Sequence, residues 1–191
     1  VGPNQGRMQV TGVMEEEEFG RQGRTMRRRS QARCSVDNVF TVLKACLGLN
    51  PQDYDIHINF PGGVPVDGPS AGVSMVTAVT SALTNRPVTS HVAMTGEVTI
   101  HGWVKAVGGI VPKVRAAAEE GITKVLIPAA NWQDILATIP GIEIVPVKKI
   151  SEVLEHALLE AGEGQSHVPF TSLNTHGLLG ASPKISSGII P

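Results

Sequence analysis

Hydrophobic and polar residues alternate in several short segments of this chain, and elsewhere hydrophobic residues recur every three or four positions. Alternation is typical of half-buried strands, whereas the longer period is typical of helices. The expected strands cover residues 7–13, 54–60, 91–107 (as two or three short strands), 124–129 and 142–147. The expected helices cover residues 25–48, 71–83, 113–120, 131–139 and 150–161. Because strands and helices alternate after residue 70, the predicted fold class is α/β.

Two of these helices are expected to be buried in different ways. The apolar residues of segment 25–48 share one helix face, which consists of Val36, Val39, Phe40, Leu43 and Leu47. Segment 71–83 is apolar on every side, as expected of a helix inside the core. Asn131 and Ser151 are expected to act as caps at the start of the last two helices.

The length of 191 residues favours one domain followed by a tail. In residues 162–191, 15 of 30 residues are Gly, Ser, Thr or Pro and no periodicity persists, so this segment is predicted to be mobile. The predicted domain is residues 1–161, with its core at about 7–159.

The charge pattern excludes some partners and singles out one segment. A formal net charge of -1 gives no field that would favour nucleic acid, and the apolar run 71–83 is too short to span a bilayer. Within residues 15–33, four consecutive glutamates precede six arginines. This run is expected to be a solvated loop that enters a helix, or alternatively a contact face for a neighbouring domain or subunit.

The two cysteines and the first residues of the chain indicate in which cellular compartment the protein is expected. Cys34 and Cys46 are separated by twelve positions, with no metal-binding spacing, so reduced and buried thiols are expected. The chain starts at Val1 without a signal peptide, as though cut from a longer protein. We expect a soluble, cytoplasmic fragment.

The segment "GGVPVDGPSAGVSM", residues 62–75, surrounds Ser70 with glycine and proline. Pro69 suits the first helical position, which would place Ser70 in the first turn, where free N–H groups can receive an oxyanion. Gly68 and its neighbours Gly62 and Gly63 would let a substrate approach the backbone closely. The alternative is that this segment is only a capped start of a helix.

A serine nucleophile needs a base, and two candidates are present. Lys113 follows Pro112, so it is expected in the first turn of a helix, where the dipole and the apolar surroundings favour its free amine. The alternative is that Lys113 simply extends into solvent. GPSAG also matches the G-x-S-x-G nucleophile elbow, for which Asp134 and His156 would complete a Ser-His-Asp hydrolase, although no strand directly precedes it.

Three motifs in order resemble the proteolytic domain of Lon, the ATP-dependent protease family, over about residues 7–159. They are "PVDGPSAG" around Ser70, "AMTGEVTIHG" at residues 93–102 and "GGIVPK" ending at Lys113. The resemblance implies the Lon protease-domain fold, a single domain of mixed sheets and packed helices. It also implies a Ser-Lys dyad, with Ser70 as nucleophile and Lys113 as base.

The resemblance implies further roles in and around the site. Thr95 would orient the lysine amine, Asp67 would lie near the dyad, and Glu97 would be a structural residue of its motif. The chain has Val66 where the better-known type has lysine, and its loop is one residue shorter, which is more similar to the second bacterial paralogue, LonB. His57 is expected either to shape the site or to serve the structure.

The function implied is a serine endopeptidase domain that degrades unfolded or damaged proteins. In the family this domain forms a homo-hexamer beneath AAA+ ATPase domains, which use ATP and magnesium. This chain contains no nucleotide-binding glycine motif, so no cofactor is expected in this domain itself. The alternative is a non-catalytic Lon-like binding module, which the presence of both Ser70 and Lys113 argues against.

Overall fold

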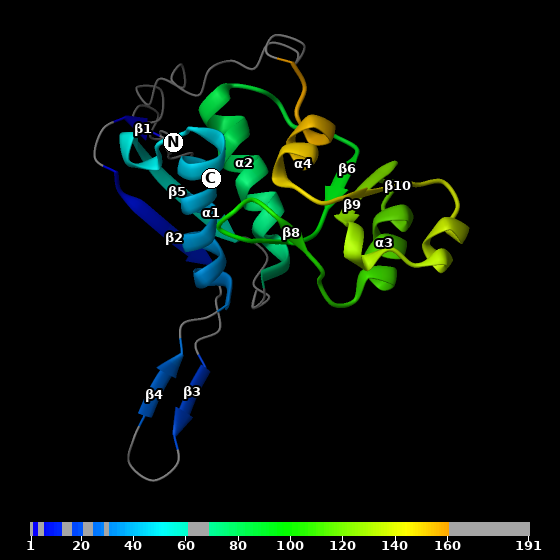
Figure 1. Cartoon of the computed structure of the whole chain (residues 1–191), viewed down its shortest axis with the longest axis horizontal. Helices are drawn as coiled ribbons and strands as arrows, with labels where there is room; N and C mark the ends of the chain where they lie inside the picture. The colour runs from blue at the N-terminus through cyan, green and yellow to red at the C-terminus, as the bar shows by residue number, and fades with distance from the viewer. Residues whose placement is uncertain are drawn as a thin grey trace, which may run out of the picture.

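The computed structural model describes residues 2–3, 6–12, 17–20, 25–28, 31–60 and 69–160, and the fold is α/β as predicted (Figure 1). The α-helices are α1 (Gln31–Leu47), α2 (Gly72–Thr84), α3 (Ile110–Glu119) and α4 (Ile150–Ala157). The strands are β1 (Gly2–Pro3), β2 (Met8–Gly12), β3 (Glu17–Gly20), β4 (Thr25–Arg28), β5 (Tyr54–Phe60), β6 (Val92–Met94), β7 (Glu97–Val98), β8 (Val104–Lys105), β9 (Lys124–Pro128) and β10 (Glu143–Val147). Short 3-10 helices are η1 (Pro51–Asp53), η2 (Pro69–Ala71), η3 (Ala129–Asn131) and η4 (Asp134–Thr138).

The first sheet has the order β1-β5-β2 and confirms both strands expected in this part of the sequence. β2 and β5 are parallel, with Met8 opposite Ile56 and Val10 opposite Ile58. Ile56 is buried and its neighbour His57 is exposed, as the alternating pattern requires. β5 ends at Phe60, and eight residues (61–68) separate it from η2, which contains Ser70.

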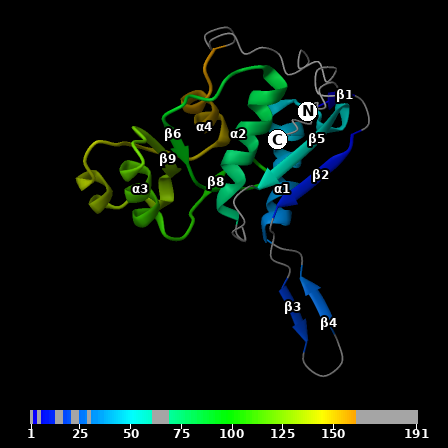
Figure 2. The ribbon, with the colours of Figure 1, turned by 180° about the vertical axis from the view of Figure 1, so that it is seen from behind.

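Helices α1 and α2 pack against each other and form the larger hydrophobic core (Figure 2). Val36, Val39 and Leu43 on the expected face of α1 are fully buried. In α2 the buried residues cover a broad face, which confirms that this helix belongs to the core, but Ala78 and Ala82 on the other side are exposed, so it is not buried on every side as expected. α2 ends at Thr84 and is followed by Asn85, whose left-handed backbone (φ 52°) turns the chain so that the next N–H, that of Arg86, bonds the Ser81 carbonyl at 3.2 Å.

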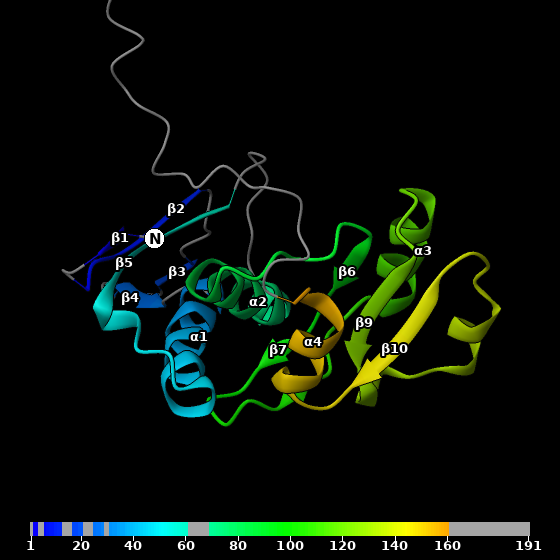
Figure 3. The ribbon, with the colours of Figure 1, turned by 90° about the horizontal axis from the view of Figure 1, so that it is seen from above.

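The second sheet, β10-β9-β6, is parallel throughout and is covered on both faces (Figure 3). Along β9, Val125 and Ile127 pack with residues of α3, whereas Leu126 between them belongs to the larger core that includes α4. Burial on both faces explains why this strand is a continuous apolar run.

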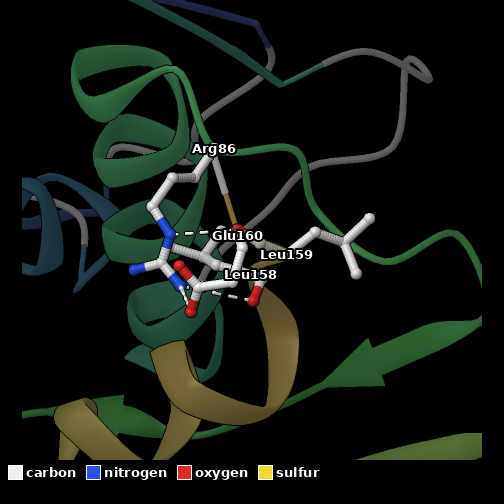
Figure 4. Close-up of polar contacts among 4 residues, drawn as sticks. All are labelled: Arg86, Leu158, Leu159 and Glu160. Carbon is white, nitrogen blue, oxygen red and sulfur yellow. Dashed lines mark hydrogen bonds and ion pairs between the residues drawn. The ribbon is translucent and has the colours of Figure 1, made fainter. Parts of the chain in front are cut away.

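Residues 86–89, which follow the end of α2, form backbone hydrogen bonds with the end of α4 and connect the two helices (Figure 4). Arg86 donates from Nε to the Leu159 carbonyl at 3.0 Å and from its terminal nitrogen to the Leu158 carbonyl at 3.5 Å. The same guanidinium lies 3.8 Å from the carboxylate of Glu160. Arg86 thus binds the carbonyls of the two residues that directly follow α4.

Two expectations about the first 48 residues are wrong. Part of the charged run is an antiparallel hairpin, β3-β4, and not a loop. α1 consequently begins at Gln31 and not at residue 25, because Thr25–Arg28 is a strand. Cys34 and Cys46 are free thiols, as expected, but both are exposed, because α1 turns them away from its buried residues.

Two further expected helices differ from the structure. The helix expected at 131–139 is absent: Asn131 is the last residue of the 3-10 turn η3, η4 follows it, and the Asn131 side chain does not cap a helix. It accepts a hydrogen bond from the Val107 N–H at 2.8 Å and donates to the Val107 carbonyl at 3.0 Å. α4 begins at Ile150, one residue before the expected Ser151 cap, and the Glu152 carboxylate accepts from the Lys148 N–H.

Within the described residues, no helix is long and apolar enough to cross a membrane. The segment 162–191, predicted to be a tail, lies outside the described residues, and so do the loop residues 61–68.

Candidate active site

Ser70 lies in the 3-10 turn η2, directly before α2, and not inside the first turn of the α-helix as expected. Its carbonyl oxygen accepts two hydrogen bonds from the β6-β7 connection, from the Gly96 N–H at 2.9 Å and from the Thr95 hydroxyl at 3.4 Å. The Val73 N–H at the start of α2 donates back to the Gly96 carbonyl at 3.2 Å. Ser70 is therefore fixed to Thr95 and Gly96, which are distant in sequence.

Two glycines permit this close approach. A Cβ at Gly96 would lie 2.7 Å from Val104 Cγ1 and 3.2 Å from Val73 Cγ1. A Cβ at Gly72 would lie 3.0 Å from the backbone nitrogen of Val98. Since carbon atoms in contact are normally 3.5–4.0 Å apart, a larger residue at Gly96 would force the serine turn and the β6-β7 connection apart.

Lys113 approaches the same place from α3. This helix begins at Ile110 after Gly109, whose backbone is left-handed (φ 66°). Pro112 is therefore the third helical residue and not the first, and Lys113 is the fourth, with its N–H bonded to the Gly109 carbonyl at 3.2 Å. The helix dipole acts less strongly at this position than at the first residue. The Lys113 side chain is exposed in the isolated chain.

The Thr95 hydroxyl lies between the lysine and the serine. Lys113 Nζ donates to Thr95 Oγ1 at 3.5 Å, and Thr95 Oγ1 donates to the Ser70 carbonyl at 3.4 Å. A hydroxyl has one hydrogen and two lone pairs, so both contacts can exist together. Among the described contacts there is no direct hydrogen bond between Ser70 Oγ and Lys113 Nζ, but both residues line one pocket.

This pocket has a volume of about 300 Å³ and an otherwise mostly apolar wall. The lining residues are Ser70, Ala71, Ser74, Ala93, Met94, Thr95, Lys113, Ala117 and Val125. A nucleophile, an amine and an apolar recess therefore lie together, which is suited to holding a peptide or ester carbonyl beside Ser70.

Ser74 and the apolar wall residues were not predicted as part of the site. Ser74 follows Ser70 by four positions, the spacing that places two residues on one helix face, and this signal was available in the sequence. Its hydroxyl donates to the Met94 carbonyl at 3.5 Å. Ala93, Met94 and Val125 come from strands β6 and β9, and no local pattern connects them to the serine segment.

The remaining predicted site residues lie elsewhere or outside the described residues. His57 is exposed on β5, with its Nε2 2.7 Å from Thr11 Oγ1, and does not line the pocket. Glu97 is opposite Lys105 in the β7-β8 pair and is also absent from the pocket wall. Asp67 and Gly68 belong to the loop 61–68, so their roles stay predictions.

The residues proposed for a Ser-His-Asp hydrolase do not come together with Ser70. His156 is exposed in the last turn of α4, and Asp134 is exposed in η4. Neither lines the serine pocket. In the described part of the chain there is also no group of three or more His, Cys, Asp or Glu residues that could hold a metal ion.

Comparison with known proteins identifies the family. Residues 3–160 match the model of the Lon protease (S16) C-terminal proteolytic domain, and the chain belongs to this family. It is 50% identical over 156 residues to Lon protease 2 of Bacillus subtilis, covering 82% of this chain and 28% of that protein. It is 47% identical over 136 residues to the Archaeal Lon protease of Methanothermobacter thermautotrophicus, covering 69% and 21%.

A third relative, Lon protease of Clostridioides difficile, is 51% identical over 128 residues, covering 62% of this chain and 16% of that protein. The chain thus spans between about a sixth and under a third of the length of these relatives. The resemblance noted from the three sequence motifs is confirmed at the level of the family, while the particular similarity to LonB stays a prediction.

Proposed function

We propose that this chain is the serine endopeptidase domain of an ATP-dependent protease, with Ser70 as nucleophile and Lys113 as general base. One observation carries the proposal: the Thr95 hydroxyl lies between Lys113 Nζ and the Ser70 carbonyl, at the wall of one pocket. A neutral amine that donates one N–H to Thr95 keeps its lone pair for the Ser70 proton. Membership of the S16 family supports the same reaction class.

In the acylation step, Ser70 Oγ attacks the carbonyl carbon of a peptide bond while Lys113 Nζ takes the hydroxyl proton. The negative charge moves to the carbonyl oxygen, where N–H groups at the start of α2 are suited to stabilise it. When the intermediate collapses, the C–N bond breaks and the lysine ammonium gives its proton to the leaving amine. The product is an ester between Ser70 and the substrate.

In the deacylation step, Lys113 takes a proton from water, and the resulting hydroxide attacks the ester carbonyl. The ester C–O bond then breaks, and the ammonium returns the proton to Ser70 Oγ. The apolar wall of the pocket is suited to an apolar side chain of the substrate next to the cleaved bond.

We propose that the natural substrates are unfolded or damaged proteins, delivered by an AAA+ ATPase part of a longer chain. ATP and magnesium would bind in that part and not in this domain. The small share of each relative that this chain covers supports a larger whole protein. A homo-hexameric ring is the assembly that we propose, and the cytoplasm the expected location.

The test combines covalent labelling with cleavage. The chain, Ser70→Ala and Lys113→Ala are each incubated with a fluorophosphonate and, separately, with casein, and products are identified by mass spectrometry. We expect label on Ser70 in the unchanged chain, none in Ser70→Ala, and a loss of casein cleavage of roughly a thousandfold or more in both variants. Lys148→Ala, an exposed lysine outside the pocket, is the matched control.

Three outcomes would contradict parts of this proposal. Equal cleavage by all variants would assign the activity to another site. Loss of labelling in Ser74→Ala, with labelling kept in Ser70→Ala, would move the nucleophile to Ser74. If the chain joined to its ATPase part neither labels nor cleaves, the non-catalytic binding module would be the better description.

A further inference from the structure

The loop between β8 and α3, residues 106–109, leads directly into the helix that carries Lys113 (Figure 1). Its two glycines contribute almost no packing. No atom of the described residues lies within 4 Å of a Cβ placed at Gly108, and at Gly109 the nearest such atom belongs to Pro112, 3.9 Å away. A contact elsewhere in the loop must therefore hold the start of α3 in place.

The side chain of Asn131 provides this contact. Its Oδ1 accepts a hydrogen bond from the Val107 N–H at 2.8 Å, and its Nδ2 donates to the Val107 carbonyl at 3.0 Å. A primary amide carries a donor and an acceptor side by side, so it can bind both backbone groups of one residue, as a paired antiparallel strand would. Because both groups of Val107 are bound, only one orientation of the amide satisfies them.

The segment that contains Asn131 also holds the buried side of α3. Leu136 in η4 is fully buried and belongs to the same hydrophobic cluster as Ile110 and Val114 of α3. Val107 packs against this cluster as well. Asn131 lies in the preceding turn, η3, so one short segment fixes both the loop before α3 and the helix itself.

Lys113 depends on the position of its helix, because its own side chain is exposed. Its Nζ lies 3.5 Å from Thr95 Oγ1, at the long end of the hydrogen-bond range. A shift of α3 by roughly half an ångström away from Thr95 would therefore break this contact. Misplacement of a catalytic group by about 1 Å can cost about a hundredfold in rate, so a residue that fixes α3 affects proton transfer.

We propose that Asn131 is a positioning residue for Lys113. By binding both backbone groups of Val107, Asn131 fixes the start of α3, and the start of α3 sets the distance from Lys113 Nζ to Thr95 and to Ser70. Asn131 is not among the described residues that line the serine pocket, so it acts through Lys113 and not on the substrate. This proposal rests on the proposed function, in which Lys113 is the general base.

The test compares how fast a fluorophosphonate labels Ser70 in the unchanged chain, in Asn131→Ala and in Asn131→Asp. The alanine removes both hydrogen bonds, whereas the aspartate still accepts from the Val107 N–H but has no donor for the Val107 carbonyl. We expect labelling to be about tenfold slower in both variants. An unchanged rate in both, with folding confirmed by urea denaturation, would overturn the proposal.

Asn50→Ala is the matched control. Asn50 also lies beside a 3-10 turn, and its Nδ2 donates to Asp53 Oδ1 at 2.9 Å, but it is not among the described residues of the serine pocket and has no contact with α3. Its loss should leave the labelling rate of Ser70 unchanged. A tenfold loss in this control as well would mean that labelling responds to any lost asparagine contact, and the proposal would fail.

A double-mutant cycle separates positioning of Lys113 from a general loosening of the site. In a Lys113→Ala chain the group that Asn131 positions is gone, so adding Asn131→Ala should slow labelling no further. If it still slows labelling about tenfold, Asn131 supports the site as a whole and the proposal is wrong. Failure of the proposed function looks different, because Lys113→Ala alone would then label Ser70 as fast as the unchanged chain.

Amide hydrogen exchange tests the structural part of the proposal without any reaction. The informative amide is that of Lys113, whose N–H bonds the Gly109 carbonyl at 3.2 Å in the first turn of α3. In Asn131→Ala we expect this amide to exchange faster than in the unchanged chain, while amides in the middle of α2 exchange as before. Equal exchange at Lys113 in the two chains would show that Asn131 does not hold the start of α3.

Discussion

Thr95 illustrates at the scale of one residue how the candidate site is held together. Its backbone N–H donates to the Leu126 carbonyl, which fixes it on the second sheet, while its hydroxyl contacts both Ser70 and Lys113. Ser70, Thr95 and Lys113 were all singled out in the sequence. Their mutual distances were not predictable, because each residue is on a different element.

Replacement of Thr95 by valine removes the hydroxyl and keeps the side-chain volume. We expect the rate of acylation to fall about tenfold, because a hydrogen bond of this kind contributes about 1–1.5 kcal/mol. Fluorophosphonate labelling of Ser70 measures this step directly. Thr95→Ser should recover most of the rate, and a Thr95→Val chain with an unchanged rate would exclude the positioning role.

Gly96→Ala is expected to lower both stability and activity. The added Cβ would meet Val104 and Val73 in the core, and overpacking of this kind costs about 1–3 kcal/mol of the free energy of unfolding. Urea denaturation measures the loss. Gly108→Ala is the matched control, because nothing lies within 4 Å of a Cβ there, and an equal loss in both variants would refute the steric explanation.

At the scale of elements, the hydrophobic pattern predicted which helices and strands exist better than it predicted the residues at which they begin and end. The faces of α1 and α2 follow directly from apolar spacing, since burial of apolar surface drives both. The start of α3 was placed three residues late, because proline was assumed to be the first helical residue, whereas the left-handed Gly109 marks the true start. Asn131 was expected to cap a helix but binds the Val107 backbone.

Arg86 is the clearest case of one side chain that connects two elements. Arg86→Ala removes two hydrogen bonds to carbonyls at the end of α4, and we expect a loss of about 1–2 kcal/mol in the free energy of unfolding. Glu160→Gln should change it by less than about 1 kcal/mol, because that ion pair is long and its carboxylate exposed. Equal losses in urea denaturation would assign the effect to the ion pair instead.

At the scale of the whole molecule, the second sheet connects the two halves of the candidate site. Met94 and Leu126 pack with the larger core, which also contains Val73 near Ser70, whereas Ala93 and Val125 pack with the core beneath α3. Successive residues of one strand face opposite sides, so β6 and β9 each contribute side chains to both cores and fix the position of one core relative to the other. The distance between Ser70 and Lys113 is therefore a property of the whole domain.

Removal of residues 162–191 tests the predicted domain boundary. We expect the shortened chain to keep its free energy of unfolding within about 0.5 kcal/mol, because the buried residues of the described chain end at Leu158. The urea midpoint and slope of the two chains are compared. A clear drop in the midpoint would mean that the tail packs on the domain.

The sequence by itself determined the α/β class, most strands and helices, the family resemblance, and Ser70, Thr95 and Lys113 as candidates. Those features follow from local periodicity and from residue types in fixed order along the chain. Only the tertiary structure decided that Thr95 lies between the other two, that Ser74 and the strand residues complete the pocket, and that His57 and Glu97 lie outside it. It also decided that the charged run pairs with itself as a hairpin. These outcomes depend on strand register and on packing between distant segments, and no local pattern encodes either of them.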